Sequence, residues 1–131
     1  VHTIDRLKIA RRLSDQRPAD LPDLNVCIEV NIDAEDSKSG VMPDAAPELA
    51  AAIAELPRLK LRGLMCLPAV RNDFDEQRDP FARLRHLLES INESGLRLDT
   101  LSMGMSADYA AAIHEGATIV RIGTAIFGAR D

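Results

Sequence analysis

Residues 101–130 read LSMGMSADYAAAIHEGATIVRIGTAIFGAR and hold two short apolar runs, each ending in small polar residues. The first run ends at Gly104 and Ser106, the second ends at Gly123 and Thr124, and a helix start is expected after each. Backbone N–H groups converge at such turns, and the dipole of the following helix favours an anion. The stretch therefore predicts two neighbouring strand ends that hold a phosphate group.

The composition excludes several classes of protein. The chain has 131 residues, 46% of them hydrophobic, and a net charge of −5, which disfavours a nucleic-acid partner. It contains no apolar run long enough for a membrane span and no signal segment, so we expect a cytoplasmic protein with no membrane partner. Cys27 and Cys66 lie in strand-like runs without metal-site spacing, which predicts buried, reduced thiols. The three histidines, at His2, His86 and His114, have no metal-ligand spacing either.

Apolar strand patterns alternate with helical patterns along the whole chain. Residues 1–4 read as the end of a strand, and further strands are expected at 26–32, 59–67, 98–103 and 117–122. The expected helices are one capped by Asp5, one capped by Asp44, one bearing Phe81, Leu84, Leu88 and Ile91, and one over 106–115. This alternation is typical of right-handed βαβ units and a parallel sheet.

The fold class is therefore α/β, as a single domain over 1–131. An eight-stranded (β/α) barrel takes about 250 residues, so the chain is expected to be the C-terminal half of such a TIM barrel, lacking its N-terminal strands. An open, doubly wound sheet is the alternative, because its sequence pattern is the same. In a barrel the polar stretches 33–40 and 71–78, which follow strands, form the active-face loops.

A half barrel leaves strand edges open at 1–4 and 117–121. It is also expected to leave apolar side chains uncovered, namely those of Val26, Ile28, Val30, Leu64 and Ile119. We therefore expect this chain to associate with the missing N-terminal half of the barrel or with a second copy of itself.

Several short segments carry a family resemblance along the whole chain. They are HTID at 2–5, VN at 30–31, SKSG at 37–40, LRGLM at 61–65, SMGMS at 102–106 and VRIGT at 120–124, followed by FG at 127–128. With them the chain resembles the C-terminal part of the pyridoxal-phosphate homeostasis proteins, barrels similar to the N-terminal domain of bacterial alanine racemases. The resemblance implies a protein that holds pyridoxal 5'-phosphate (PLP) as a Schiff base and stores or delivers it without turnover.

That resemblance also implies a cofactor site. The family's Schiff-base lysine lies on the first barrel strand, which this sequence does not contain, and Lys38 is a solvated loop residue that we do not assign as a substitute. The Ser106 hydroxyl and the amides of Ala107 and Asp108 would face the phosphate, with the Asp108 side chain in solvent. Gly123 and Thr124 would add donors. The alternatives are a Ser106 that only caps its helix and an ordinary turn at Gly123.

Arg121 is the most informative single residue, because an arginine inside an apolar strand must find a partner. It either pairs with carboxylates inside the barrel or meets the pyridine nitrogen of the cofactor. A guanidinium leaves that nitrogen unprotonated and the electron sink weak, which suits a binding protein. The other expected binding residues are Gly104, Met105, Asn31 and Met65; the methionines, with Met103, are alternatively core residues.

We assign no catalytic residue. A PLP-dependent racemase or decarboxylase of the same barrel type is the alternative function, and it needs a second acid–base group. Tyr109, the only tyrosine, is badly placed for that task. A third reading is a phosphate-binding barrel enzyme that does not use PLP.

Overall fold

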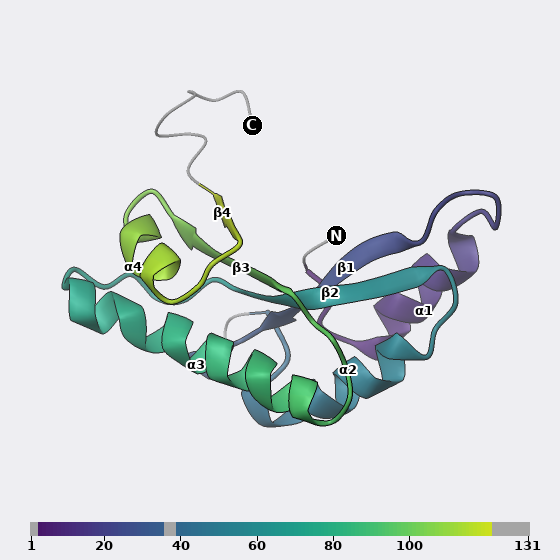
Figure 1. Ribbon diagram of the computed structural model, residues 1–131, viewed down its shortest axis with the longest axis horizontal. Coiled ribbons are helices and arrows are strands. Elements are labelled where there is room, and N and C mark those ends of the chain that lie inside the picture. The colour runs from purple at the N-terminus through teal and green to yellow at the C-terminus, as the bar shows by residue number, and fades with distance from the viewer. Residues whose placement is uncertain (1–2, 36–38, 122–131) are drawn as a thin grey trace.

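The computed structural model describes residues 3–35 and 39–121, which form a twisted parallel sheet with helices packed against it (Figure 1). The elements follow the expected alternation of helix and strand. In chain order they are α1 (Leu7–Gln16), β1 (Leu24–Val30), η1 (Pro43–Ala45), α2 (Ala46–Ala54), β2 (Leu59–Cys66), α3 (Phe74–Glu93), β3 (Thr100–Met105), α4 (Tyr109–His114) and β4 (Ile119–Arg121).

The order of the strands decides between the two expected folds. The sheet runs β1-β2-β3-β4 with every pair parallel, so each crossover moves one strand in the same direction. A doubly wound sheet reverses direction at a switch point, whereas a barrel sheet does not. Ile4 and Val41 make isolated parallel bridges to Ile28 and Val30, on the edge of β1 away from β2. The described strands therefore have barrel order.

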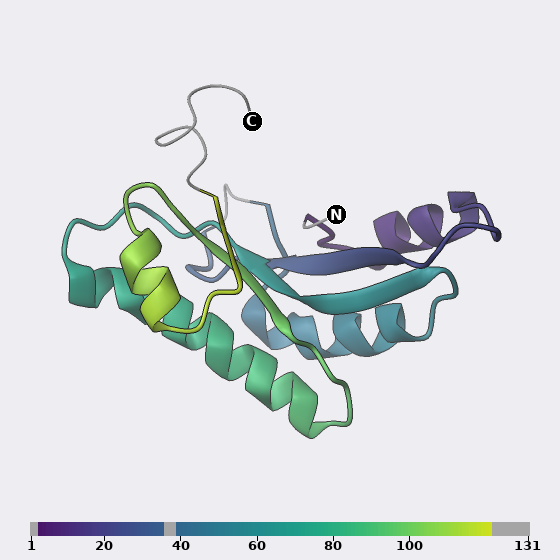
Figure 2. The ribbon, with the colours of Figure 1, turned by 45° about the horizontal axis from the view of Figure 1, so that its top comes forward.

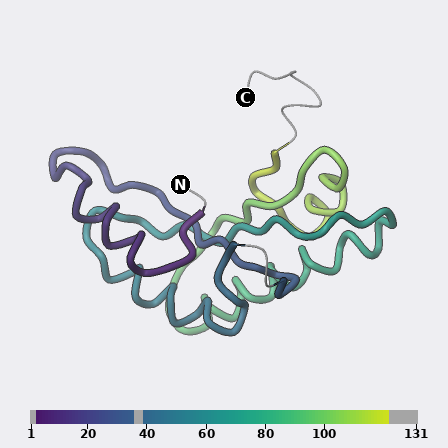
Figure 3. Tube along the Cα trace, turned by 180° about the vertical axis from the view of Figure 1, so that it is seen from behind, coloured from purple at the N-terminus to yellow at the C-terminus, as the bar shows by residue number. Residues whose placement is uncertain are grey.

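The helices form a layer outside the sheet. Turning the molecule shows α2 and α3 on one side of the central strands (Figure 2), and α1 lies beside α2 when the chain is seen from behind (Figure 3). α3 packs against α4 as well as against the sheet. The expected apolar stripe of α3 is confirmed, because its four members are buried in the core: Phe81, Leu84, Leu88 and Ile91.

The expectation of uncovered apolar side chains on the sheet is wrong for four of the five residues. Val26, Ile28, Val30 and Leu64 are fully buried in the same core. Side chains alternate between the two faces of a strand, and these four face the helix layer. Ile119 alone is partly uncovered, at 38% exposed. The opposite face is largely polar, and an open pocket there is lined by Asn25, Cys27, Arg62, Thr100 and Ile119.

Several helix starts differ from the sequence prediction. Arg6 rather than Asp5 occupies the N-cap of α1, and Asp44 lies in the short helix η1 ahead of α2. The Asp5 carboxylate instead accepts a hydrogen bond from the Gly40 N–H at 3.1 Å. The stretch 71–78 is only partly a loop, because Asp73 caps α3 by accepting a hydrogen bond from the N–H of Glu76 at 3.1 Å. An aspartate followed three residues later by a glutamate is a helix-start signal.

Gly63 allows β2 and β3 to come together. It pairs with Thr100, and a Cβ atom at position 63 would lie only 1.7 Å from the Thr100 carbonyl oxygen. The residues that directly precede the two members of this pair also contact each other. The Asp99 N–H donates to the Arg62 carbonyl at 2.8 Å, and the two side chains form an ion pair of 2.7 Å. A side chain at position 63 would therefore have to push two hydrogen-bonded backbones apart.

We expect Gly63→Ala to lower the free energy of unfolding by about 3 kcal/mol or more, because the new methyl group meets backbone that cannot rotate away. Lys60→Ala is the matched control on the same strand, since Lys60 is exposed, and it should change that free energy by no more than about 0.5 kcal/mol. Urea unfolding followed by circular dichroism measures both. Equal midpoints for the two variants would contradict the close approach of β2 and β3.

Candidate functional site

A pocket of about 310 Å³ opens between the loops that follow β2 and β3. Gly104, Met105 and Ser106, three of the residues expected to bind a cofactor, line it together. The β2 side contributes the second wall. The remaining lining residues are Cys66, Leu67, Pro68, Val70, Arg71, Ala107 and Asp108. The carboxyl ends of parallel strands carry the binding sites in barrel folds, so this is the expected end of the sheet.

The turn after β3 is closed by its own hydrogen bonds. The Asp108 N–H donates to the Met105 carbonyl at 3.1 Å, and the Asp108 carboxylate accepts from the Met105 N–H at 2.8 Å. The expectation that the Asp108 side chain points to solvent is therefore wrong. Asp108, not Ser106, is the N-cap of α4, which begins three residues later than expected. Ser106 and Ala107 lie between Met105 and Asp108, at the exposed tip of the turn, and take no part in this pair of hydrogen bonds.

Gly104 is buried at the point where α4 crosses the end of β3. Its φ angle is +105°, a conformation that residues with a side chain rarely adopt. A Cβ atom there would lie 2.7 Å from the Cβ of Ala112 on α4. Glycine at 104 therefore allows the chain to turn out of the strand and lets α4 pack closely beside the pocket.

Arg121 ends β4 beside this pocket. Its guanidinium donates to the Ser102 hydroxyl at 2.6 Å and to the carbonyl of Cys66, a lining residue, at 3.4 Å. Both acceptors are neutral, so these contacts differ from the carboxylate pairing that was one of the two expectations. Burial raises the pKa of the Cys66 thiol to about 12, and the Arg121 charge opposes that shift. Cys66 and Cys27 are both buried and free, as the sequence predicted.

Asn31 and Met65 do not line this pocket. Asn31 lines a neighbouring pocket, which shares Leu67 with the first. Its side-chain amide is hydrogen-bonded at both ends to the backbone of Glu35, at 2.6 Å and 3.2 Å. Met65 is buried in β2 and does not line the pocket between the two loops. A ligand-binding role for either residue stays a prediction. The predictions for Gly123, Thr124 and Lys38 concern residues outside the described part of the chain.

Asp33 connects the loops at this end of the sheet, and it is not among the site residues predicted from the sequence. Its carboxylate accepts hydrogen bonds from the Ala69 N–H at 2.7 Å, from Arg71 at 2.7 Å and from Arg83 at 3.2 Å. The side chain is only 10% exposed. The Arg71 hydrogen bond is the main reason why the pKa of Asp33 falls to about 2, while burial opposes the shift. The sequence feature that could have indicated this contact is an acidic residue in one polar loop and an arginine in the polar loop after the next strand.

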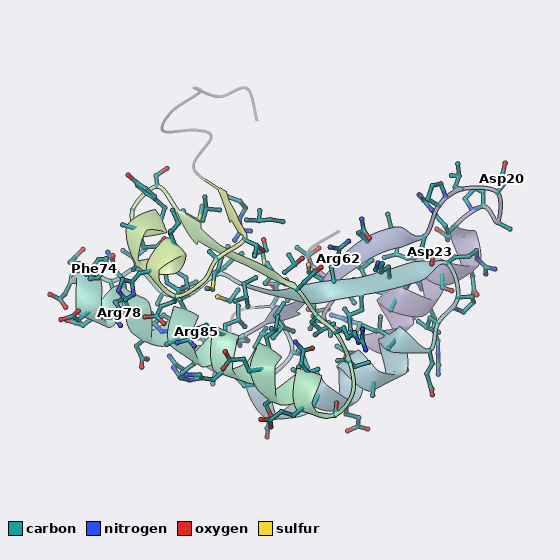
Figure 4. The ribbon with its side chains drawn as sticks, viewed as in Figure 1. Asp20, Asp23, Arg62, Phe74, Arg78 and Arg85 are labelled. Carbon is teal, nitrogen blue, oxygen red and sulfur yellow. The ribbon has the colours of Figure 1, made fainter. Side chains whose placement is uncertain are left out.

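A second buried carboxylate joins α4 to α3. Glu115 is 4% exposed and binds two arginines of α3, Arg78 at 2.7 Å and Arg85 at 3.0 Å (Figure 4). The Arg78 hydrogen bond is the main reason why the pKa of Glu115 falls to about 2. Phe74 extends the contact, with its ring at right angles to that of His114. This cluster holds the short helix that follows the pocket turn.

Two kinds of feature are absent from the part of the chain that the structure describes. No three histidine, cysteine or acidic side chains come together there as a metal site would require. Nor does any helix in this part combine the length and the apolar character needed to cross a membrane.

A parallel sheet in chain order, with a pocket at the carboxyl ends of its strands, defines a protein of the (β/α) barrel class. Comparison with known families agrees. The chain belongs to the family described as alanine racemase, N-terminal domain, which matches residues 1–131. The family predicted from the sequence is thereby confirmed. The half of that domain to which the chain corresponds stays a prediction.

The individual relatives share one cofactor in their names. The chain is 61% identical to the pyridoxal phosphate homeostasis protein of Pseudomonas aeruginosa over 131 residues, which are 100% of this chain and 56% of that protein. The Escherichia coli protein of the same name is 55% identical over 130 residues, 99% of this chain and 56% of that protein. The solved structure of PipY from Synechococcus elongatus with PLP bound has a TM-score of 0.83 at 28% identity, covering 97% of this chain and 59% of that one. The chain therefore spans little more than half the length of these relatives.

We expect acid to weaken the fold through Asp33. Because the folded state lowers the pKa of this carboxyl from 3.8 to about 2, its ion pairs stabilise the protein fully above the unfolded value, and that stability is lost as the pH falls from about 4 to 2. Asp33→Asn should lower the free energy of unfolding at pH 7 by about 2 kcal/mol and flatten the acid dependence.

The matched control is Asp23→Asn, which removes the same charge from an exposed position before β1 (Figure 4). Urea unfolding at a series of pH values between 7 and 2 measures the free energy of unfolding of the wild-type protein and of both variants. An acid dependence that is equally steep in Asp33→Asn and Asp23→Asn would contradict the role given to Asp33.

Proposed function

We propose that this chain is part of a protein that binds PLP and maintains its supply in the cell, storing or delivering the cofactor without turning over a substrate. The observation that carries the proposal is the shared pocket of Gly104, Met105 and Ser106, the turn that the sequence marks for a phosphate. The names of the relatives and the PLP bound in PipY support the choice of ligand.

The lining of the pocket fits the two parts of PLP. Leu67, Pro68, Val70 and Met105 offer apolar surface against which a flat ring can pack. The tip of the turn offers the Ser106 hydroxyl and the N–H groups of Ser106 and Ala107 to a phosphate, and backbone N–H groups suit that anion well. Gly123 and Thr124 would add donors from the next strand end.

Arg121 would orient the ring. Its guanidinium is already held by Ser102 and the Cys66 carbonyl, so it is fixed beside the pocket before a ligand arrives. An arginine that donates to the pyridine nitrogen keeps this nitrogen unprotonated. When bound, PLP supplies a reactive aldehyde and an electron sink. An arginine partner weakens that sink, which supports a binding role over catalysis.

The rest of the proposal concerns the whole protein. The chain would supply the C-terminal portion of the barrel as a single domain, and the Schiff-base lysine would come from the N-terminal strands. Those strands, or a second copy of this chain, would close the sheet. The free, buried thiols of Cys27 and Cys66 support a cytoplasmic location.

We expect Ser106→Ala to weaken PLP binding by the full-length protein by roughly 1–2 kcal/mol, because the phosphate loses a hydrogen bond from a hydroxyl group. Ser90→Ala, the same substitution at an exposed position on α3, is the control and should bind PLP with wild-type affinity. Absorbance titration with PLP measures the dissociation constants. Wild-type affinity in Ser106→Ala would remove Ser106 from the site.

We expect Arg121→Ala to shift the absorbance spectrum of bound PLP more than it changes phosphate affinity, because the arginine faces the ring and not the phosphate. Arg121→Lys keeps the charge but loses the planar pair of donors, and should shift the spectrum less. Spectra recorded at saturating PLP, together with competition by inorganic phosphate, separate the two effects. A spectrum identical to wild type in both variants would contradict ring contact.

A further inference from the structure

Gln77 bridges the two loops that form the walls of the pocket. It lies in the first turn of α3, and its side-chain nitrogen Nε2 donates to the Arg71 carbonyl oxygen at 2.8 Å and to the Ala107 carbonyl oxygen at 3.3 Å. Arg71 lies in the loop after β2, and Ala107 lies at the tip of the turn after β3. Both residues line the pocket. One amide group therefore holds both walls.

The loop after β2 is also fixed from its other side. Asp33 accepts from the Ala69 N–H and from the Arg71 guanidinium, and Arg71 donates back to the Ala69 carbonyl at 3.1 Å. This wall is thus anchored to the end of β1 independently of Gln77. The turn after β3 is closed internally between Met105 and Asp108, which fixes its shape but not its distance from the opposite wall. Gln77 supplies a link across that distance.

The helix that carries Gln77 provides a rigid base. Asp73 caps it, and Pro80 and Phe81 in the next turn are buried in the core. A side chain that extends from a fixed helix turn to two carbonyl groups sets how far apart those carbonyls lie. Both partners are acceptors, so the position requires a group with two N–H donors on one atom, which a glutamine amide provides.

We infer that Gln77 is a positioning residue that sets the separation of the two walls and thereby the affinity of the turn at Ser106 and Ala107 for a phosphate group. The inference rests on the proposed function, since it concerns the same pocket. Gln77 need not touch the ligand. It acts through Ala107, whose carbonyl it holds and whose N–H belongs to the tip of the turn.

Replacement by glutamate separates positioning from folding. In Gln77→Glu an acceptor oxygen takes the place of Nε2 and faces both carbonyl oxygens, so both hydrogen bonds are lost and repulsion is added. A glutamate in the first turn of a helix is nevertheless favoured by the helix dipole, so the helix itself is not weakened. The variant should therefore lose phosphate affinity without losing stability.

The test is a set of titrations on the full-length protein with PLP, with pyridoxal, which lacks the phosphate, and with inorganic phosphate. We expect Gln77→Glu to bind PLP and inorganic phosphate about 10-fold more weakly, and Gln77→Ala about 3-fold more weakly, because each lost hydrogen bond has a modest net effect. Affinity for pyridoxal and the thermal unfolding midpoint should stay close to wild type. Gln16→Glu, the same charge change at an exposed position on α1, should leave all of these values unchanged.

The outcomes distinguish this inference from the proposed function. If Gln77→Glu binds PLP as wild type does while Ser106→Ala binds it more weakly, the positioning role is wrong and the phosphate site stands. If Gln77→Glu weakens pyridoxal as much as PLP, or lowers the unfolding midpoint in parallel with affinity, the role is structural and the inference is also overturned. If the wild-type protein binds neither PLP nor inorganic phosphate, the proposed function itself fails.

Discussion

A buried carboxylate at the end of the sheet organises the candidate site. Asp33 follows β1, and burial without partners would be unfavourable for its charge. The partners come from elsewhere in the chain: a backbone N–H and an arginine from the loop after β2, and a second arginine from α3. Arg83 also donates to the Ile32 carbonyl at 2.7 Å, so the same helix holds both the acid and the backbone before it. Satisfying one charge thus fixes two loops and a helix.

The cluster around Glu115 is a similar arrangement in the crossover from β3 to β4. Here the acid binds two arginines that both belong to α3, and again the contact fixes a segment next to a loop that lines the pocket. α3 is therefore the common support of the site, because it contributes to both clusters and carries Gln77 between the two walls. α4 is short, and it is held by the Glu115 ion pairs in addition to its buried residues Ala111 and Ala112.

Periodic features of the sequence predicted the fold well, whereas contacts between distant loops could not be predicted from the sequence. The spacing of Phe81, Leu84, Leu88 and Ile91 placed the buried stripe of α3, because helical periodicity is a local property. The glycine and serine at 104 and 106 indicated the turn that lines the pocket. Asp108 was misjudged because its carboxylate bonds to the backbone of its own turn, an alternative to solvent that composition does not reveal. The helix-facing side of Val26 and Leu64 was also missed, since alternation along a strand does not say which face is covered.

The contrast between the two faces of the sheet has a consequence for how the sheet is stabilised. One face is sealed by this chain's own helices, and the other carries mainly polar side chains such as those of Asn25, Arg62 and Thr100. The helices of the chain itself bury the apolar face of such a sheet. The polar face can contact water or another layer of the same kind. The hydrophobic contacts that hold the described strands and helices together therefore lie within this one chain, on the helix side of the sheet, and the polar side is left to hydration.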